Sequence, residues 1–185
     1  MTINKERVLS IVRFSIAGTA LNQNQKDGFS YFLSKIEQTE IDKRWIAYIL
    51  ATVWHETLHT MHPVSEKGNY KHFRNYEYLN GNIFLGDGFR YRGRGYVPLA
   101  WRDNYEKFGR FLGLELVGNP DCVLNPEIAW RILFTGMTEG LFTGEKLLKY
   151  FNEVNTDWIE ARKIIHDSDD AEQIAEQAKK FFEAL

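Results

Sequence analysis

The sequence predicts a mainly α-helical fold in a single domain that spans residues 1–185. Three observations predict it. Apolar residues recur at helical spacing along most of the chain, residues typical of helix starts precede several of these segments, and one glycine-rich stretch lacks any sustained period. A chain of 185 residues, 44% of them hydrophobic, is long enough to bury one substantial core, with one or two lobes.

Eight segments show the helical period. Their approximate ranges are 4–17, 26–38, 42–59, 103–113, 126–139, 144–151, 156–166 and 170–183. Asp42 and Asp103 stand at expected N-cap positions, and Asn125 before Pro126 combines an N-cap residue with a first-turn proline. Residues 60–98 contain six glycines and many aromatic residues, so we expect loops and a small hairpin there.

Charge and cysteine usage exclude several classes of protein. The 23 basic and 25 acidic side chains leave a net charge of -2, which does not favour a nucleic-acid partner. The interleaved arginines and aromatic residues of 90–96 form too short a segment to change that expectation. Cys122 is the only cysteine, so an intramolecular disulfide and a thiolate zinc site are excluded.

An amphipathic helix, rather than an export signal, is expected at the amino terminus. Val8, Val12 and Ile16 recur at helical spacing, and Arg13 interrupts the apolar stretch. We therefore expect no signal peptide and a protein that starts in the cytoplasm. The charge-free apolar run from Trp45 to Trp54 is about half as long as the roughly 20 residues that span a bilayer.

The segment 42–59 places a carboxylate on an apolar helix. Glu56 follows three apolar residues at helical spacing, Trp45, Ile49 and Val53. Desolvation and the negative end of the helix dipole both raise the pKa of a carboxyl group. A carboxylic acid that keeps its proton near neutral pH is suited to general acid catalysis, so Glu56 is the first catalytic candidate. A glutamate paired to an arginine at a helix end is the alternative.

The same segment also fits a zinc-binding pattern. His55, Glu56 and His59 match the His-Glu-x-x-His motif, in which two histidines on one helix face hold zinc. The third ligand of the extended motif is missing, Glu77 is the one tempting substitute, and Pro63 ends the helix soon after His59. We therefore expect no metal or other cofactor, and a zinc peptidase stays as an alternative.

Three blocks of sequence resemble glycoside hydrolase family 19, the chitinase-like group that includes many phage and prophage endolysins. They are HET at 55–57 with MHPVSE at 61–66, YRGRGYVPL at 91–99, and RDNY at 102–105 with GNPD at 118–121 and NPEIA at 125–129. The resemblance implies a lysozyme-like fold with a substrate cleft between two lobes, and no metal. It also implies that Glu56 is the general acid and that Glu66 is the closest match to the base that activates water. If Glu66 is not the base, Glu77 is the substitute. The alternative interpretation of Glu66 is a solvated glutamate on the surface.

The likeness is weaker at positions that hold sugar. Where the family shows glutamine and then serine or threonine, this chain has Pro98 and Ala100, which lack the amide and the hydroxyl. The expected substrate-binding residues are His55, Tyr91, Arg94, Tyr96, Trp101 and Asn104. Core packing is the alternative for the aromatic residues, and a structural ion pair is the alternative for Arg94.

Local charge favours one substrate. Residues 67–110 carry nine basic and four acidic side chains, which suits the free carboxylates of peptidoglycan better than neutral chitin. We therefore predict a monomeric endolysin of the muramidase type, which reaches the cell wall after release from the host cytoplasm. It would hydrolyse the β-1,4 bond between N-acetylmuramic acid and N-acetylglucosamine. A chitinase, the zinc peptidase and a non-catalytic wall-binding module are the alternatives.

The carboxyl-terminal segment carries an apolar stripe. Ile174, Ala178, Phe181 and Leu185 lie on one face of a predicted helix, beside two lysines. Such a helix can dock on a core or touch a membrane. We expect docking, with weak membrane contact as the alternative.

Overall fold

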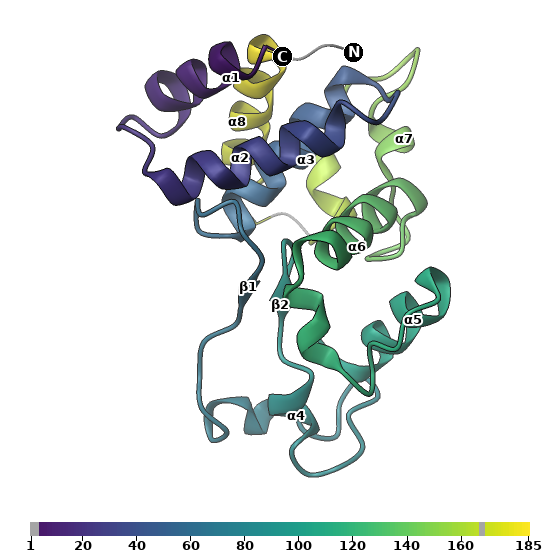
Figure 1. Cartoon of the computed structure of the whole chain (residues 1–185). Helices are drawn as coiled ribbons and strands as arrows, with labels where there is room; N and C mark the ends of the chain where they lie inside the picture. The colour runs from purple at the N-terminus through teal and green to yellow at the C-terminus, as the bar shows by residue number, and fades with distance from the viewer. Residues whose placement is uncertain (1–3, 167–168) are drawn as a thin grey trace. The chain divides into compact units, whose positions relative to one another are not determined.

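The computed structural model describes residues 4–166 and 169–185, and the chain divides into two compact units (Figure 1). The first unit consists of the described residues of Met1–Met61 and Met137–Leu185, and the second of His62–Gly136. The predicted mainly α fold is confirmed, because the long elements are all helices and the strands are short. The single domain expected over 1–185 stays a prediction.

The first unit is helical. Its elements are α1 (Lys5–Ile11), the π-helical turn η1 (Val12–Ile16), α2 (Gln23–Ile36), α3 (Lys43–Glu56), α7 (Leu147–Tyr150), the 3-10 turn η4 (Glu160–Ile164) and α8 (Ala171–Ala184). Helix α3 is central, since every residue from Ile46 to Trp54 is buried. The expected long helices at 144–151 and 156–166 are replaced by the short α7 and η4.

Helix α8 packs against α3. Ile174, Ala178 and Phe181 are fully buried, and the ring of Phe181 lies 6.0 Å from that of Phe29 in α2. Docking of the carboxyl-terminal stripe is therefore confirmed. This packing does not favour membrane contact through the stripe, because three of its four side chains are already buried in the first unit. Among the residues that the structure describes, no helix is both long and apolar enough to cross a bilayer.

Local capping explains where the helices begin. The Asp42 carboxylate accepts the backbone N–H of Arg44 at 2.8 Å, as expected for an N-cap. Asn125 accepts the backbone N–H of Glu127 at 2.9 Å, ahead of α6. Asp103 is not an N-cap, because α5 begins at Arg102 and Asp103 lies inside its first turn.

The second unit combines short elements with two longer helices. They are β1 (Val64–Ser65), the 3-10 turn η2 (His72–Tyr76), α4 (Asp87–Arg90), β2 (Arg94–Gly95), α5 (Arg102–Leu112), the 3-10 turn η3 (Pro120–Leu124) and α6 (Pro126–Glu139), whose last residues belong to the first unit. β1 and β2 pair antiparallel, with Val64 opposite Gly95. The expected small hairpin region is thus confirmed, with a long connection between its strands.

Candidate active site

Glu56 is the last residue of α3 and pairs with an arginine from a distant part of the chain. Arg162 of η4 donates from Nη1 to Glu56 Oε1 at 2.7 Å, and the two side chains are 5% and 12% exposed. Arg162 also donates from Nε to the carbonyl of Asp169 at 3.0 Å. The structure thus contains the arginine pair that the sequence left as an alternative, at a nearly buried acid.

The backbone beyond Glu56 is strained. Leu58, His59 and Met61 have φ values of 52°, 66° and 59°, in the left-handed region that non-glycine residues rarely adopt. Thr57 holds this turn: its hydroxyl donates to the Val53 carbonyl at 2.7 Å and accepts the Met61 N–H at 3.0 Å. The helix therefore ends at Glu56 and not at 59 as predicted. Backbone strain of this kind gathers at functional sites.

The two histidines beside Glu56 have separate surroundings. His55 Nε2 lies 3.4 Å from Asp170 Oδ2, which precedes α8. His59 lies outside the helix and stacks on Trp54, with 4.5 Å between the ring centroids. Partial burial and the neighbouring His55 lower the pKa of His59. The zinc motif needs both histidines on one helix face. Because α3 ends at Glu56, His55 and His59 do not share a helix face. Within residues 4–166 and 169–185, no group of three potential ligands could hold a metal ion.

Glu66 follows β1 and is held at both carboxylate oxygens. The Gly93 N–H donates to Oε2 at 3.0 Å, and the Tyr76 hydroxyl donates to Oε1 at 2.9 Å. The Glu66 backbone N–H in turn donates to the Gly93 carbonyl at 2.8 Å. A Cβ at position 93 would stand 3.2 Å from Oε2 and 2.9 Å from the Pro98 Cβ, so glycine permits this close approach. Glu66 is half-buried and positioned, unlike a freely solvated surface glutamate.

Tyr76 links Glu66 to an aromatic pair. Its ring lies 4.4 Å from that of Trp101, and Trp101 has a φ of 76°. Burial and the bond to Glu66 raise the pKa of Tyr76, which keeps its hydroxyl a donor. Trp101 is half-buried. Sequence reasoning missed Tyr76, since no motif marks it among the aromatic residues of that stretch.

Glu77 has a structural setting. It is 9% exposed, and its two oxygens accept the backbone N–H groups of Gly86 and Gly88 at 2.9 and 3.2 Å. Both oxygens are thus turned into the loop that leads to α4. This arrangement favours Glu66 over Glu77 as the second carboxylate.

Two tyrosines expected to form a sugar-stacking wall lie in the core instead. Tyr91 and Tyr96 are each 2% exposed. The Tyr91 ring lies 5.5 Å from that of Tyr105, and its hydroxyl donates to the Val117 carbonyl at 3.2 Å. The expectation was wrong for this pair because apolar burial of the rings leaves no face for a sugar.

Arg94 is a structural residue, and Asn104 bonds locally. Arg94 is 2% exposed, with Nε 2.8 Å from the Asp121 carboxylate. Its Nη1 donates to the Tyr105 hydroxyl at 3.0 Å. Arg94 therefore forms the structural ion pair given as the alternative, and not the expected contact with a sugar. The Asn104 amide donates to the Ala100 carbonyl at 2.9 Å, in the first turn of α5.

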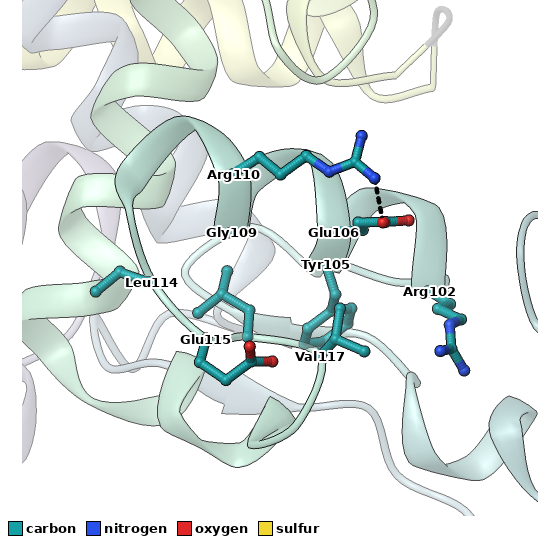
Figure 2. Close-up of a pocket in the computed structure, with 9 residues that line it drawn as sticks. Arg102, Tyr105, Glu106, Gly109, Arg110, Leu114, Glu115 and Val117 are labelled. Carbon is teal, nitrogen blue, oxygen red and sulfur yellow. Dashed lines mark hydrogen bonds and ion pairs between the residues drawn. The ribbon is translucent and has the colours of Figure 1, made fainter.

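A hollow of about 320 Å³ lies along α5 (Figure 2). Arg110 and Glu106 form an ion pair at its edge, and Arg102 and Glu115 also line it. None of the expected catalytic or substrate-binding residues lines this hollow, so it is separate from the site around Glu66.

Comparisons with known proteins support the family resemblance. No family model matches the chain. An endochitinase of Arabidopsis thaliana is 36% identical over 93 residues, which are 49% of this chain and 34% of that protein. The chain is thus similar to a plant chitinase over about half of its own length. The phage endolysin subgroup stays a prediction.

The chain spans about a third of the length of that endochitinase. A protein of Hevea brasiliensis named as an inactive chitinase-like protein is 44% identical over 41 residues, 22% of this chain and 13% of that protein. Chitinase C of Streptomyces griseus has 24% identity and a TM-score of 0.48, over 73% of this chain and 65% of that structure.

The Glu56–Arg162 pair predicts a measurable coupling. We expect Arg162→Met to lower the free energy of unfolding by about 3 kcal/mol, because it leaves the nearly buried carboxyl group of Glu56 without its hydrogen-bonding partner. Adding Glu56→Gln should restore part of that loss, with a coupling of about 1–3 kcal/mol in a double-mutant cycle. Urea unfolding at neutral pH measures both quantities.

The matched control is Lys163→Met, which removes the neighbouring cation. Lys163 pairs with Glu160 on the surface, where both side chains are about half exposed, so little change in stability is expected. Equal effects of the two substitutions, or no coupling between Arg162 and Glu56, would contradict the assigned pair.

Proposed function

We propose that the chain is a glycoside hydrolase that cleaves β-1,4-linked polymers of N-acetylated amino sugars, and bacterial peptidoglycan in particular. The observation that carries the proposal is the Glu56 carboxyl group, 12% exposed at the end of α3 and followed by strained backbone. Relationship to the chitinases supports the same chemistry.

Two carboxyl groups have separate roles in the proposed reaction. A glycosidic oxygen is a poor leaving group until it is protonated, and Glu56 is the proposed proton donor. Glu66 is the proposed base: it removes a proton from the water that attacks the anomeric carbon from the opposite face of the sugar. The Gly93 N–H and the Tyr76 hydroxyl hold the Glu66 carboxylate in a fixed orientation. Such positioning is what a base needs before the substrate arrives.

Charge near Glu66 supports peptidoglycan over chitin. Arg92, next to Gly93, donates from Nε to the Ser65 hydroxyl at 3.2 Å, which brings its guanidinium close to the candidate base. A cation at this place suits a polymer with free carboxylates. Pro98 and Ala100, in place of the amide and hydroxyl expected of chitinases, also favour a substrate handled differently from chitin.

A chitinase is the second candidate, because the similar Arabidopsis thaliana protein is named an endochitinase. Digestion of purified peptidoglycan and of colloidal chitin, with identification of the new reducing ends, separates the two. We expect new N-acetylmuramic acid ends and at least about tenfold slower release from chitin. New N-acetylglucosamine ends would contradict the muramidase assignment, and free amines would indicate a peptidase or amidase. Binding to cell walls without any released fragment would instead identify a wall-binding module.

A further inference from the structure

The loop between η2 and α4 buries its polar side chains and exposes its apolar ones. Glu77, Asn82 and Asp87 are 9%, 1% and 5% exposed. The outward side chains are Tyr78 (67% exposed), Leu79 (51%), Ile83 (60%), Phe84 (61%) and Leu85 (71%). This distribution is the reverse of the usual one, and contiguous exposed apolar side chains of this kind mark interaction surfaces. We call these five outward residues the apolar tip.

Hydrogen bonds inside the loop hold the apolar tip in place. Asp87 Oδ2 accepts the backbone N–H groups of both Ile83 and Phe84 at 3.0 Å. The Asn82 amide donates to the Tyr76 carbonyl at 2.8 Å and accepts the Arg102 N–H at 3.1 Å. The exposed side chains therefore project from a backbone that is already ordered, which lowers the entropy cost of docking.

The chain around the apolar tip presents positive charge. The exposed charged side chains between positions 67 and 90 are Lys67, Lys71, Arg74 and Arg90. The two acidic residues of this range, Glu77 and Asp87, are buried and occupied by backbone N–H groups. The exposed Asp103 of α5 also lies against this loop, at Gly81. A partner of this face thus meets apolar groups and an excess of cations over acids.

A hollow of about 510 Å³ lies beside the apolar tip. Phe84 and Leu85 line it together with Arg90 and Arg102. The Arg102 guanidinium lies 5.7 Å from the centre of the Phe84 ring. Apolar walls and guanidinium groups in one hollow suit a molecule that carries an anionic group next to an apolar part.

We propose that the apolar tip docks on a bilayer of anionic phospholipids. The interface of such a bilayer offers acyl chains for Ile83, Phe84 and Leu85 and phosphate groups for the surrounding cations. Tyr78 has the apolar ring and polar hydroxyl of residues that gather at membrane interfaces. The loop lies at the α4 end of the second unit, away from β1 and β2 (Figure 1).

Vesicle binding by the full chain tests the proposal. We expect sedimentation with vesicles of equimolar phosphatidylcholine and phosphatidylglycerol, at least about tenfold stronger than with phosphatidylcholine alone and weakened by salt. The triple variant Ile83→Ser, Phe84→Ser, Leu85→Ser should reduce the partition coefficient by about tenfold or more. These side chains are exposed, so circular dichroism should confirm an unchanged fold. Phe111→Ser, at a 55% exposed position of α5, is the matched control and should bind like the unaltered chain.

Two results would overturn the proposal. One is equal binding of the unaltered chain and the triple variant to anionic vesicles, including no binding by either. The other is unchanged vesicle binding by the triple variant together with lost retention on insoluble peptidoglycan, which would identify a glycan-binding surface. Cleavage of soluble peptidoglycan fragments should be the same in the triple variant, which separates this proposal from the proposed hydrolase activity.

Discussion

Glu56→Gln is expected to lower the rate of peptidoglycan cleavage by about 10²–10⁴-fold. The glutamine side chain has the same size, and its oxygen can still accept from Arg162, so the fold should persist. What it loses is the acidic proton that the glycosidic oxygen needs in order to leave. Release of reducing sugars from purified cell walls measures the rate, and circular dichroism with thermal unfolding measures the fold.

The matched control for this change is Glu160→Gln in the same unit. Glu160 is about half exposed and pairs with Lys163 on the surface, so its substitution should leave the rate unchanged. Cleavage by Glu56→Gln at the same rate as by the unaltered chain would remove Glu56 from the catalytic machinery.

Deletion of residues 170–185 is expected to unfold the first unit. The deletion removes α8, whose Ile174 and Phe181 are fully buried and which packs along α3. Phe181→Ala alone should lower the free energy of unfolding by about 3–5 kcal/mol, because it leaves a cavity beside Phe29. That loss is a large part of the roughly 5–15 kcal/mol by which domains are stable.

Phe14→Ala is the control for the loss of a phenyl ring. Phe14 is 70% exposed, so its replacement should change stability little. Urea unfolding of the variants and of the truncated chain provides the comparison. A stable truncated chain that keeps its activity would show that α8 is dispensable for the core.

Periodicity and capping predicted long helices. The segment 126–139 is helical over the predicted range, and the apolar segment that begins after Asp42 is the buried α3. Where the predicted end of a helix was wrong, local hydrogen bonds override the helical period of the apolar residues. Thr57 ends α3 early through bonds to Val53 and Met61, and these contacts are not visible as a repeat in the sequence.

The surroundings of the candidate carboxylates were harder to predict. Arg162 is 106 positions from Glu56, and Tyr76 contacts Glu66 across a loop, so only the folded chain brings them together. Tyr91 and Arg94 illustrate the opposite error. They lie in the block that resembles family 19, yet both are buried and bonded to the second unit's own residues. Residue type and motif therefore predicted the candidate acids, and burial decided which of their neighbours are structural.

The most direct test asks whether Glu56 gives its proton to the departing sugar oxygen. It compares the unaltered chain and Glu56→Gln on two matched substrates, one with a sugar leaving group and one with dinitrophenolate, which departs without protonation. The account predicts that Glu56→Gln loses about 10³-fold on the first substrate and stays within about tenfold of the unaltered chain on the second. An equal loss on both substrates, or no loss on either, would contradict it.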